Sequence, residues 1–394
     1  MEKRTFKYIQ GNQTFYSTVM TFKEIIENSF VSIYSRDNRL GYQRTLIERH
    51  LKKIVVSLKT DDTPISPTSI LLGIDEDNLI ESSIDNMISL QFNRDDGGHI
   101  FRIVDGQHRI MAMKKYIDEL TDRGDLNKLN EINSYEFSVI IMPISIYKRI
   151  KEVEVFQSIN AKAKPLKTDL IKLALTRYQE LEKINQLDYT NHLANRIIFS
   201  LNDNKPYNEE QNLFTGDIIN VWENAIIIDV NNDDEIGVIG YSAFYKSIEQ
   251  ICKFYTNNIE TNFNENTTYE ELDKHLNMLS NELTFELFVP CWKIIMDRWK
   301  KCFSYKKLSF DFEIYYNEEF YIQKNMGLRS LHNILYTIIK SEDVNIKDYS
   351  YILNQFREII YSSKLIDEDW KKGGRFKGLS SEAGFKHIEN IIKK

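Results

Sequence analysis

Hydrophobic residues follow two different periods along this chain. Over roughly the first 165 residues, short runs of β-branched and aromatic residues are separated by polar turns, as in strands. A helical pattern over residues 46–59 lies between them, with its apolar residues largely on one face. The strand candidates are TFYSTVMTF (14–22), TSILLGI (68–74), HIFRIV (99–104) and EFSVIIMPI (136–144).

From Leu166 onward, apolar residues recur at steps of three and four positions, as in amphipathic helices. The polar stretch NNIETNFNENTT (257–268) predicts a surface loop among them. A chain of 394 residues is also too long for one typical core. We therefore expect an α/β (α+β) protein with a small mixed-sheet domain over residues 1–165 and a mainly α-helical domain over residues 166–394. The expected helices cover 167–184, 269–283, 288–303, 328–341 and 349–363.

Charge and cysteine content restrict the functional classes. The chain carries 58 acidic and 51 basic residues, a net charge of −7, so any nucleic-acid site must be a local basic patch. The three cysteines lack CxxC spacing, which argues against a disulfide framework or a thiolate zinc site and favours a reducing cytoplasm. No apolar run approaches the roughly 20 residues that span a bilayer. The polar N-terminal segment argues against a signal peptide.

The stretch FRIVDGQHRIMAMKKY (101–116) combines the residues with the clearest chemistry. Its apolar residues end a strand at Val104 and begin a helical stripe at Ile110, which places residues 105–109 on a strand-to-helix turn. The free N–H groups and the dipole of a helix start favour an anion. We therefore expect a phosphate site at this turn.

Each residue of the turn has a possible part in such a site. Asp105 is a good N-cap, and Gly106 permits close approach of the backbone to a ligand. Arg109 can donate two hydrogen bonds to a phosphate, and Gln107 and His108 add neutral donors. The Asp105 carboxylate would repel phosphate unless it caps away from the ligand or meets it through a divalent cation. An ordinary turn, with Asp105 as cap and a solvated first helical turn, is the alternative.

A second segment, VFQSINAKAKPLKTDLIKLAL (155–175), predicts a helix, a short loop and another helix. Asn160 is suited to ending the first helix and Pro165 to turning the chain, while Thr168 or Asp169 can cap the second helix. The lysines of this loop make it basic; they are Lys162, Lys164 and Lys167. A plain helix–loop–helix with solvated lysines explains the same residues.

Together these two segments resemble the DGQHR-domain family, whose pentapeptide is complete here at residues 105–109. The upstream stretch GYQRTLIERHLKKIVVSLKTDDTPISPTSILLGI (41–74) is similar to the same family. The downstream Phe-x-x-Ile-Asn…Pro-Leu…Asp-Leu arrangement is shared with it and, more distantly, with the DUF262 nuclease group. The resemblance covers roughly residues 35–175.

The resemblance implies a ParB/sulfiredoxin-like fold, in which nucleotide phosphates lie at a Gly-x-x-Arg helix start. Gly106 and Arg109 have that spacing. A later helix would line the nucleotide with Gln157 and Asn160, and Arg44 would reach the same pocket. The family includes DndB-type regulators encoded with DNA phosphorothioation systems, and a nucleotide-hydrolysing component of deazaguanine DNA modification.

Three functions are compatible with these observations. The first is a cytoplasmic protein of bacterial DNA modification or defence that binds ATP, GTP or CTP with Mg²⁺ and hydrolyses it slowly, with Asp105 and His108 as catalytic residues. The second is a non-enzymatic DNA-binding transcriptional regulator of a phosphorothioation cluster, using basic segments. The third is a DUF262-like nuclease. The expected partners are DNA and DNA-modification proteins, with homo-oligomerisation left open. The basic segments are 3–7, 50–59 and 370–378.

Overall fold

The computed structural model covers two compact units, Met1–Glu182 and Lys183–Lys394, and each is described by itself. The expected boundary after residue 165 falls before helix α6 (Thr168–Leu181), which lies in the first unit. The structure describes the whole chain except residues 36–37, 61–67, 85–86, 93–97, 161–167, 185–186, 208–218, 229–235, 261–266, 310–311 and 342–343.

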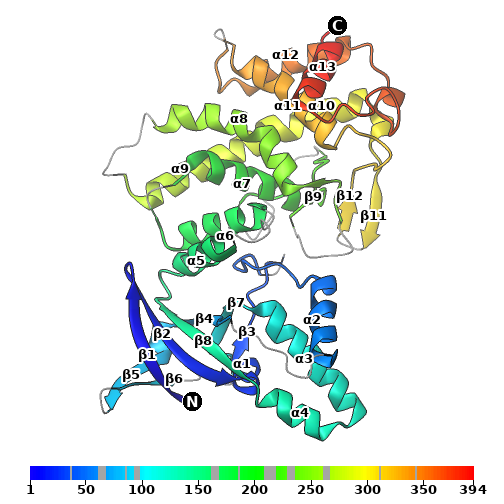
Figure 1. The fold of residues 1–394 in the computed structure, drawn as a ribbon. Helices are drawn as coiled ribbons and strands as arrows, with labels where there is room; N and C mark the ends of the chain where they lie inside the picture. Colours follow the sequence, from blue (N-terminus) through cyan, green and yellow to red (C-terminus); the bar gives the residue numbers. More distant parts are fainter. Residues whose placement is uncertain are drawn as a thin grey trace. The chain divides into compact units, whose positions relative to one another are not determined.

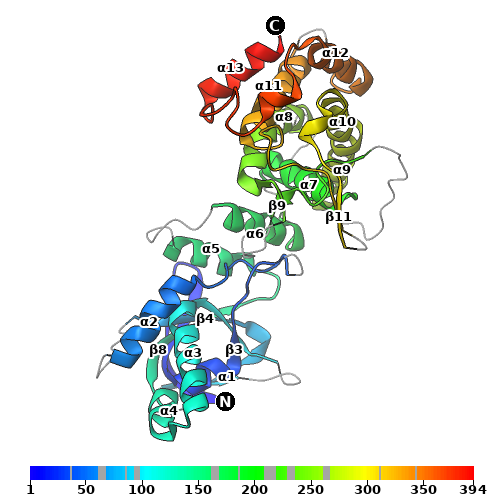
Figure 2. The ribbon, with the colours of Figure 1, turned by 90° about the vertical axis from the view of Figure 1, so that its right-hand side faces the viewer.

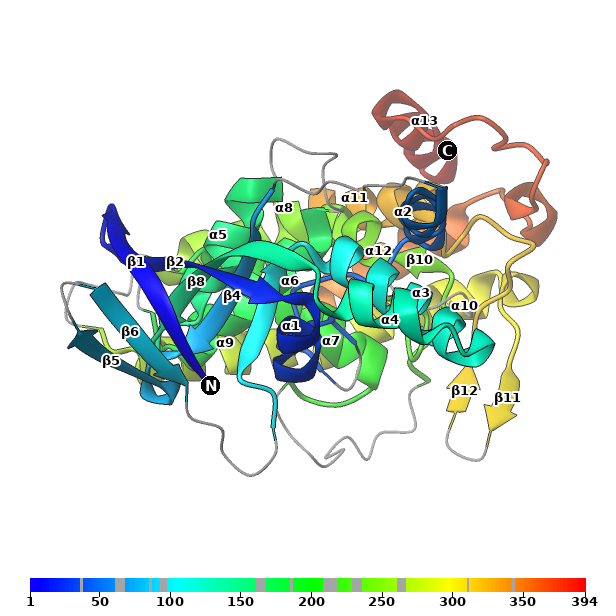
Figure 3. The same cartoon turned by 60° about the horizontal axis from the view of Figure 1, so that its bottom comes forward.

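The first unit is built on an eight-stranded mixed sheet with the order β3-β7-β4-β8-β2-β1-β6-β5 (Figure 1). The pairs β3–β7 and β4–β8 are parallel, and the others are antiparallel. Figure 3 shows β1, β2, β5 and β6 gathered at one end of this sheet. The strands are β1 (Glu2–Gln10), β2 (Gln13–Thr21), β3 (Ser29–Phe30), β4 (Ile70–Asp75), β5 (Leu79–Ile84), β6 (Met87–Phe92), β7 (Phe101–Asp105) and β8 (Glu136–Ile144).

The four strands predicted from the sequence are confirmed as β2, β4, β7 and β8. The helix predicted over 46–59 is confirmed as α2 (Glu48–Thr60). A mixed sheet with helices is therefore established for this part of the chain, whereas its ParB/sulfiredoxin-like character stays a prediction. The remaining helices of the unit are α1 (Phe22–Asn28), α3 (Gln107–Arg123), α4 (Leu126–Asn133) and α5 (Ile150–Asn160).

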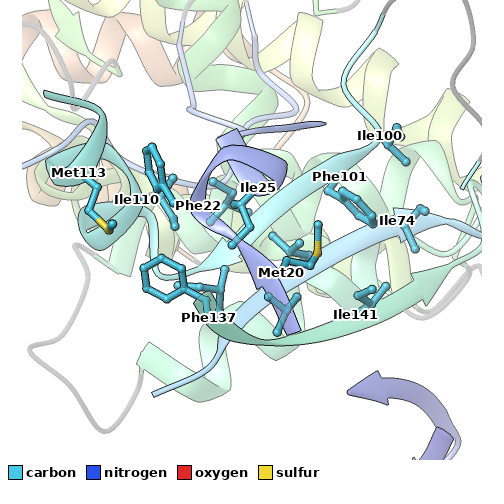
Figure 4. Packing of buried hydrophobic residues seen from close by; sticks show 14 of the residues in the cluster. Met20, Phe22, Ile25, Ile74, Ile100, Phe101, Ile110, Met113, Phe137 and Ile141 are labelled. Carbon is cyan, nitrogen blue, oxygen red and sulfur yellow. The ribbon is translucent and has the colours of Figure 1, made fainter. Parts of the chain in front are cut away.

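One face of the sheet packs against α1 and α3. Phe22 and Ile25 of α1 and Ile110 of α3 are fully buried against sheet residues such as Phe101 and Ile141 (Figure 4). Burial of these apolar side chains is the main contribution to the stability of the unit. This packing fixes the start of α3 at the end of β7.

The opposite face of β7 and β4 carries a buried charge network. The Arg102 guanidinium donates to both carboxylate oxygens of Glu152 on α5, at 2.9 Å each, and lies 2.9 Å from Asp75. The Tyr42 hydroxyl donates to the same Glu152 carboxylate at 2.6 Å. Gly73 leaves the space that this carboxylate occupies, because a Cβ there would overlap the Glu152 oxygen. The network holds α5 and the Tyr42 segment on the sheet.

The second unit is built from helices with two short two-stranded ladders, β9–β10 and β11–β12 (Figure 2). The helices predicted over 269–283, 288–303, 328–341 and 349–363 are confirmed, as is 167–184 in the first unit. The elements are α7 (Tyr189–Asp203), β9 (Ile226–Ile227), β10 (Ile239–Gly240), α8 (Tyr241–Glu260), α9 (Tyr269–Glu282), α10 (Val289–Arg298), β11 (Lys306–Ser309), β12 (Phe312–Ile314), α11 (Asn325–Ile339), α12 (Tyr349–Ser362) and α13 (Glu382–Ile392).

The loop predicted over 257–268 is wrong at its start, because α8 continues to Glu260. Residues 261–266 of that stretch lie outside the described part of the chain. Its end supplies the Thr268 cap of α9, whose hydroxyl accepts from the Glu271 N–H. In the described residues, no helix combines the length and apolar character that crossing a membrane requires.

The core of the second unit surrounds a buried histidine. The Trp292 indole donates to His332 Nε2 at 2.9 Å, and His332 Nδ1 lies 2.9 Å from the Ser247 hydroxyl. Trp222 packs edge-on against Trp292, with ring centroids 4.6 Å apart. Burial, together with the nearby positive charge of Arg329, lowers the pKa of His332 to about 3. His332 is therefore neutral at pH 7.

Candidate functional site

The Asp-Gly-Gln-His-Arg pentapeptide lies on the strand-to-helix turn predicted for it. β7 ends at Asp105 and α3 begins at Gln107. Gly106 is the N-cap, with φ of +97°, and no side chain caps the helix. A Cβ at Gly106 would lie 2.5 Å from Cδ1 of Ile70, so both its conformation and its surroundings favour glycine.

The expectation that Asp105 caps α3 is wrong. Asp105 pairs with Leu71 in the β7–β4 ladder, so the strand continues one residue further than that expectation assumed. The carboxylate is 42% exposed and lies 3.9 Å from the Arg109 guanidinium. The first amides of α3 are therefore left without a side-chain cap, as an anion site at a helix start requires.

Arg109 uses its guanidinium to hold the start of β4. One terminal nitrogen donates to the Thr68 carbonyl, and the other donates to the Ser69 carbonyl at 2.9 Å. Burial lowers the pKa of Arg109, and the Asp105 carboxylate opposes that effect. A phosphate at this turn would share the guanidinium with these two carbonyls, so Arg109 has a structural part whether or not an anion binds.

His108 lies between the starts of α3 and α2. Its Nε2 accepts a long hydrogen bond, 3.5 Å, from the Ile47 N–H, and the His50 ring centroid is 5.9 Å away. Burial lowers the pKa of His108, and the positive charge of Arg44 lowers it further. We therefore expect His108 to be neutral, with Nε2 as the hydrogen-bond acceptor. Gln107 is buried beside it, and its Oε1 has no hydrogen-bond partner in the described part of the chain.

The two residues predicted on the later helix lie at the end of α5. Gln157 is exposed, and the Asn160 amide donates to the Phe156 carbonyl at 2.8 Å. Within the described residues, no hydrogen bond or ion pair joins either side chain to the pentapeptide, so their sharing one pocket stays a prediction. Pro165 and the three loop lysines lie outside the described residues, as do the side chains of Thr168 and Asp169.

Beside this turn, α2 presents a positively charged face. Its apolar side, including Leu51 and Val55, packs near Ala112 of α3. Its outer side carries residues at helical spacing that line a shallow depression; they are Glu48, Arg49, Lys52, Lys53 and Val56. Glu48 lies 3.0 Å from Lys52 and 3.2 Å from Lys115.

Arg49 and Lys53 have no carboxylate partner within 4.0 Å in the part of the chain that the structure describes, and the same is true of Arg44. From the sequence, residues 46–59 form an amphipathic helix and residues 50–59 one of three basic segments. Which of the cations are already paired depends on where Glu48 and Lys115 lie after folding, and the sequence does not show this.

These features define a mixed-sheet α/β protein with a basic helix face beside its strand-to-helix turn. In the described residues, no cluster of three His, Cys, Asp or Glu side chains is arranged to hold a metal. The chain belongs to the DndB family, described as DNA-sulfur modification-associated, whose model matches residues 4–374. The match confirms the resemblance to DndB-type proteins and covers nearly the whole chain, including most of the second unit. No curated protein and no solved structure matches the chain.

Proposed function

We propose that this protein is a non-enzymatic DNA-binding regulator of a DNA-sulfur modification (phosphorothioation) cluster. The observation that carries the proposal is the outer face of α2, where Arg49 and Lys53 have no carboxylate partner among the described residues. Family membership supports a part in DNA-sulfur modification. Contacts from Lys and Arg to DNA phosphates supply much of the affinity of proteins for DNA.

The geometry of α2 suits docking on a duplex. Arg49, Lys52, Lys53 and Val56 occupy positions i, i+3, i+4 and i+7 on one face, and Val56 is 57% exposed. A helix fits the major groove, where cations contact phosphates and an aliphatic side chain can contact a thymine methyl group. With a net charge of −7 on the whole chain, such a local patch would also orient the protein toward DNA.

Binding to a short fluorescent duplex from the promoter of the modification genes tests the proposal. We expect Arg49→Ala/Lys53→Ala to weaken binding about tenfold or more and to reduce the slope of log K against log salt by about 2. The matched control is Lys128→Ala/Lys151→Ala, which removes two lysines already paired with Glu131 and Glu154 at 2.8 and 2.7 Å. Equal losses in both variants, or no binding by the native protein at low salt, would refute it.

A second candidate, binding of ATP, GTP or CTP with Mg²⁺, is favoured by the uncapped start of α3 beside Arg44. In that function Gly106, Gln107 and Arg109 would contact phosphates, and Asp105 and His108 would serve slow hydrolysis. Calorimetry of native protein and of Arg44→Ala separates it from the first, and heat that vanishes in the variant is expected. Arg44→Ala is preferable to Arg109→Ala because Arg109 also holds β4. No heat with the native protein would exclude this candidate.

The nuclease hypothesis predicts a different activity. It requires nicking of plasmid DNA that depends on added Mg²⁺ or Mn²⁺. A preparation that binds the duplex but leaves plasmid intact in both metals would favour the regulator. We propose DNA and the proteins of the same modification system as the partners.

A further inference from the structure

Two loops of the second unit lie side by side. One directly precedes α11 in the chain, and the other follows α12. The Tyr321 N–H donates to the Trp370 carbonyl at 2.7 Å, and the Lys372 N–H donates to the Glu319 carbonyl, also at 2.7 Å. A β-bridge joins Phe320 to Lys371. These backbone contacts fix the position of residues 319–321 against residues 370–372.

The first loop places Lys324 directly before the first residue of α11. Its carbonyl accepts from the Leu328 N–H at 3.0 Å, and its N–H donates to the Tyr321 carbonyl at 3.0 Å. Gln323 beside it is buried, and its amide donates to the Val221 carbonyl at 2.9 Å. Gly327 lies so close to the Ile322 backbone that no side chain would fit. The backbone that carries Lys324 is therefore held on both sides.

The second loop is basic and anchored at two aromatic residues. Trp370 and Phe376 are fully buried, with ring centroids 4.9 Å apart. The exposed cations of this loop are Lys371, Lys372, Arg375 and Lys377. Burial of the two rings orders a loop whose charged side chains remain in solvent.

The backbone contacts bring Lys372 close to Lys324, because the Lys372 N–H donates to the Glu319 carbonyl and the Lys324 N–H donates to the Tyr321 carbonyl. Burial lowers the pKa of Lys324, Lys372 lowers it further, and the carboxylates of Glu318 and Glu319 oppose this in part. Two other cations nearby are paired: Lys301 lies 3.0 Å from Glu368, and Arg375 lies 3.7 Å from Asp369. For Lys324 and Lys372, no carboxylate lies within 4.0 Å in the part of the molecule that is described. Two like charges held together in this way favour a shared anion.

We propose that Lys324 and Lys372 together bind one phosphate group of the DNA backbone. The proposal rests on the DNA-binding function proposed above and adds a second contact region, in the second unit, to that of α2. A phosphate between the two ammonium groups would replace their repulsion with two charge-assisted hydrogen bonds. The start of the 15-residue helix α11 adds partial positive charge at the same place.

Duplex binding by Lys324→Gln/Lys372→Gln tests this directly. Because the two lysines share one phosphate, we expect the slope of log K against log salt to fall by about 1 and affinity to fall roughly three- to tenfold. The matched control is Lys183→Gln/Lys293→Gln, which removes two lysines of the same unit that are paired with Glu270 and Asp297 at 2.7 and 2.5 Å. An unchanged slope, or the same fall in the control, would overturn the proposal.

Inorganic phosphate distinguishes the source of the anion. Resonances of the two lysine side chains are followed by NMR while phosphate or duplex is added to native protein. A response to the duplex at much lower concentration than to inorganic phosphate supports a DNA contact. A response to phosphate, with DNA binding of the double variant unchanged, would show a site for a free anion and overturn the proposal. If the α2 variant loses DNA affinity and the Lys324/Lys372 variant does not, this inference fails while the proposed function stands.

Discussion

One buried polar site in each unit of the molecule illustrates a different way of burying polar side chains. The first keeps full charges inside, with Arg102 surrounded by Glu152, Asp75 and the Tyr42 hydroxyl. The second keeps a titratable group inside in its neutral form, with His332 between Trp292 and Ser247. A buried ion pair is costly to break from one side, whereas a buried neutral histidine is costly to protonate. The two sites should therefore differ in what destabilises them.

The largest effect is expected from Glu152→Leu in the first unit. It leaves the Arg102 guanidinium buried beside only Asp75, and removing one partner of a buried pair costs roughly 3–5 kcal/mol. Hydrogen exchange of peptides from β4 and β7, measured with increasing urea, would report the loss. In Glu152→Leu/Arg102→Met, which removes both charges, we expect much of the stability to return. A single variant as stable as the double would show that the network contributes little.

Acid should act on the second unit through His332. Its folded pKa of about 3 lies below the ordinary value of 6.5, so the unfolded state takes up the proton first as pH falls. This histidine's contribution is present above pH 6.5 and is lost toward pH 3, by roughly 2 kcal/mol between pH 7 and pH 5.

Tryptophan fluorescence during urea unfolding isolates this effect, because all four tryptophans lie in the second unit: Trp222, Trp292, Trp299 and Trp370. His332→Gln should be less stable at pH 7 but should flatten the dependence between pH 7 and pH 5. The exposed His387→Gln is the control and should retain the native slope. A slope that survives in His332→Gln would assign the acid sensitivity to other groups.

A smaller loss of stability is expected from alanine substitutions at the two ends of α3. Comparing them tests whether the pentapeptide is as tightly packed as the rest of the first unit. Gly106 and Gly124, at the two ends of α3, have φ of +97° and +70°. A Cβ meets Ile70 at Gly106 but meets nothing within 4 Å at Gly124. Alanine should strain both backbones, and Gly106→Ala should cost about 1 kcal/mol more because of crowding. Chemical denaturation measures the difference; equal losses would mean that Ile70 moves aside freely.

The sequence predicted the strands that are buried and missed those with polar faces. β4 and β8 are nearly continuous apolar runs, so their pattern is clear. β1, with the sequence EKRTFKYIQ, has mostly exposed side chains and no apolar alternation to find. The long helix α7 was missed for the opposite reason. It is buried over most of its length, polar Asn195 and Arg196 included, so it has no polar face.

At the candidate site, the location of the turn was predictable and its contacts were not. A strand meeting a helix at Gly106 follows from local pattern alone. The carbonyls that Arg109 holds, Thr68 and Ser69, are about 40 positions away in the chain, so only the sheet brings them there. The segments that carry Lys324 and Lys372 are likewise brought together only by backbone contacts between two loops that are distant in the sequence. The sharing of one pocket by Gln157, Asn160 and the turn stays a prediction.

Gly73 gives the buried charge network a genetic consequence. Any side chain at this position would enter the space of the Glu152 carboxylate. Positions 73 and 152 should therefore covary among relatives, with larger residues at 73 appearing only where 152 has become small. In a saturation library, substitutions at the two sites would show strong positive epistasis.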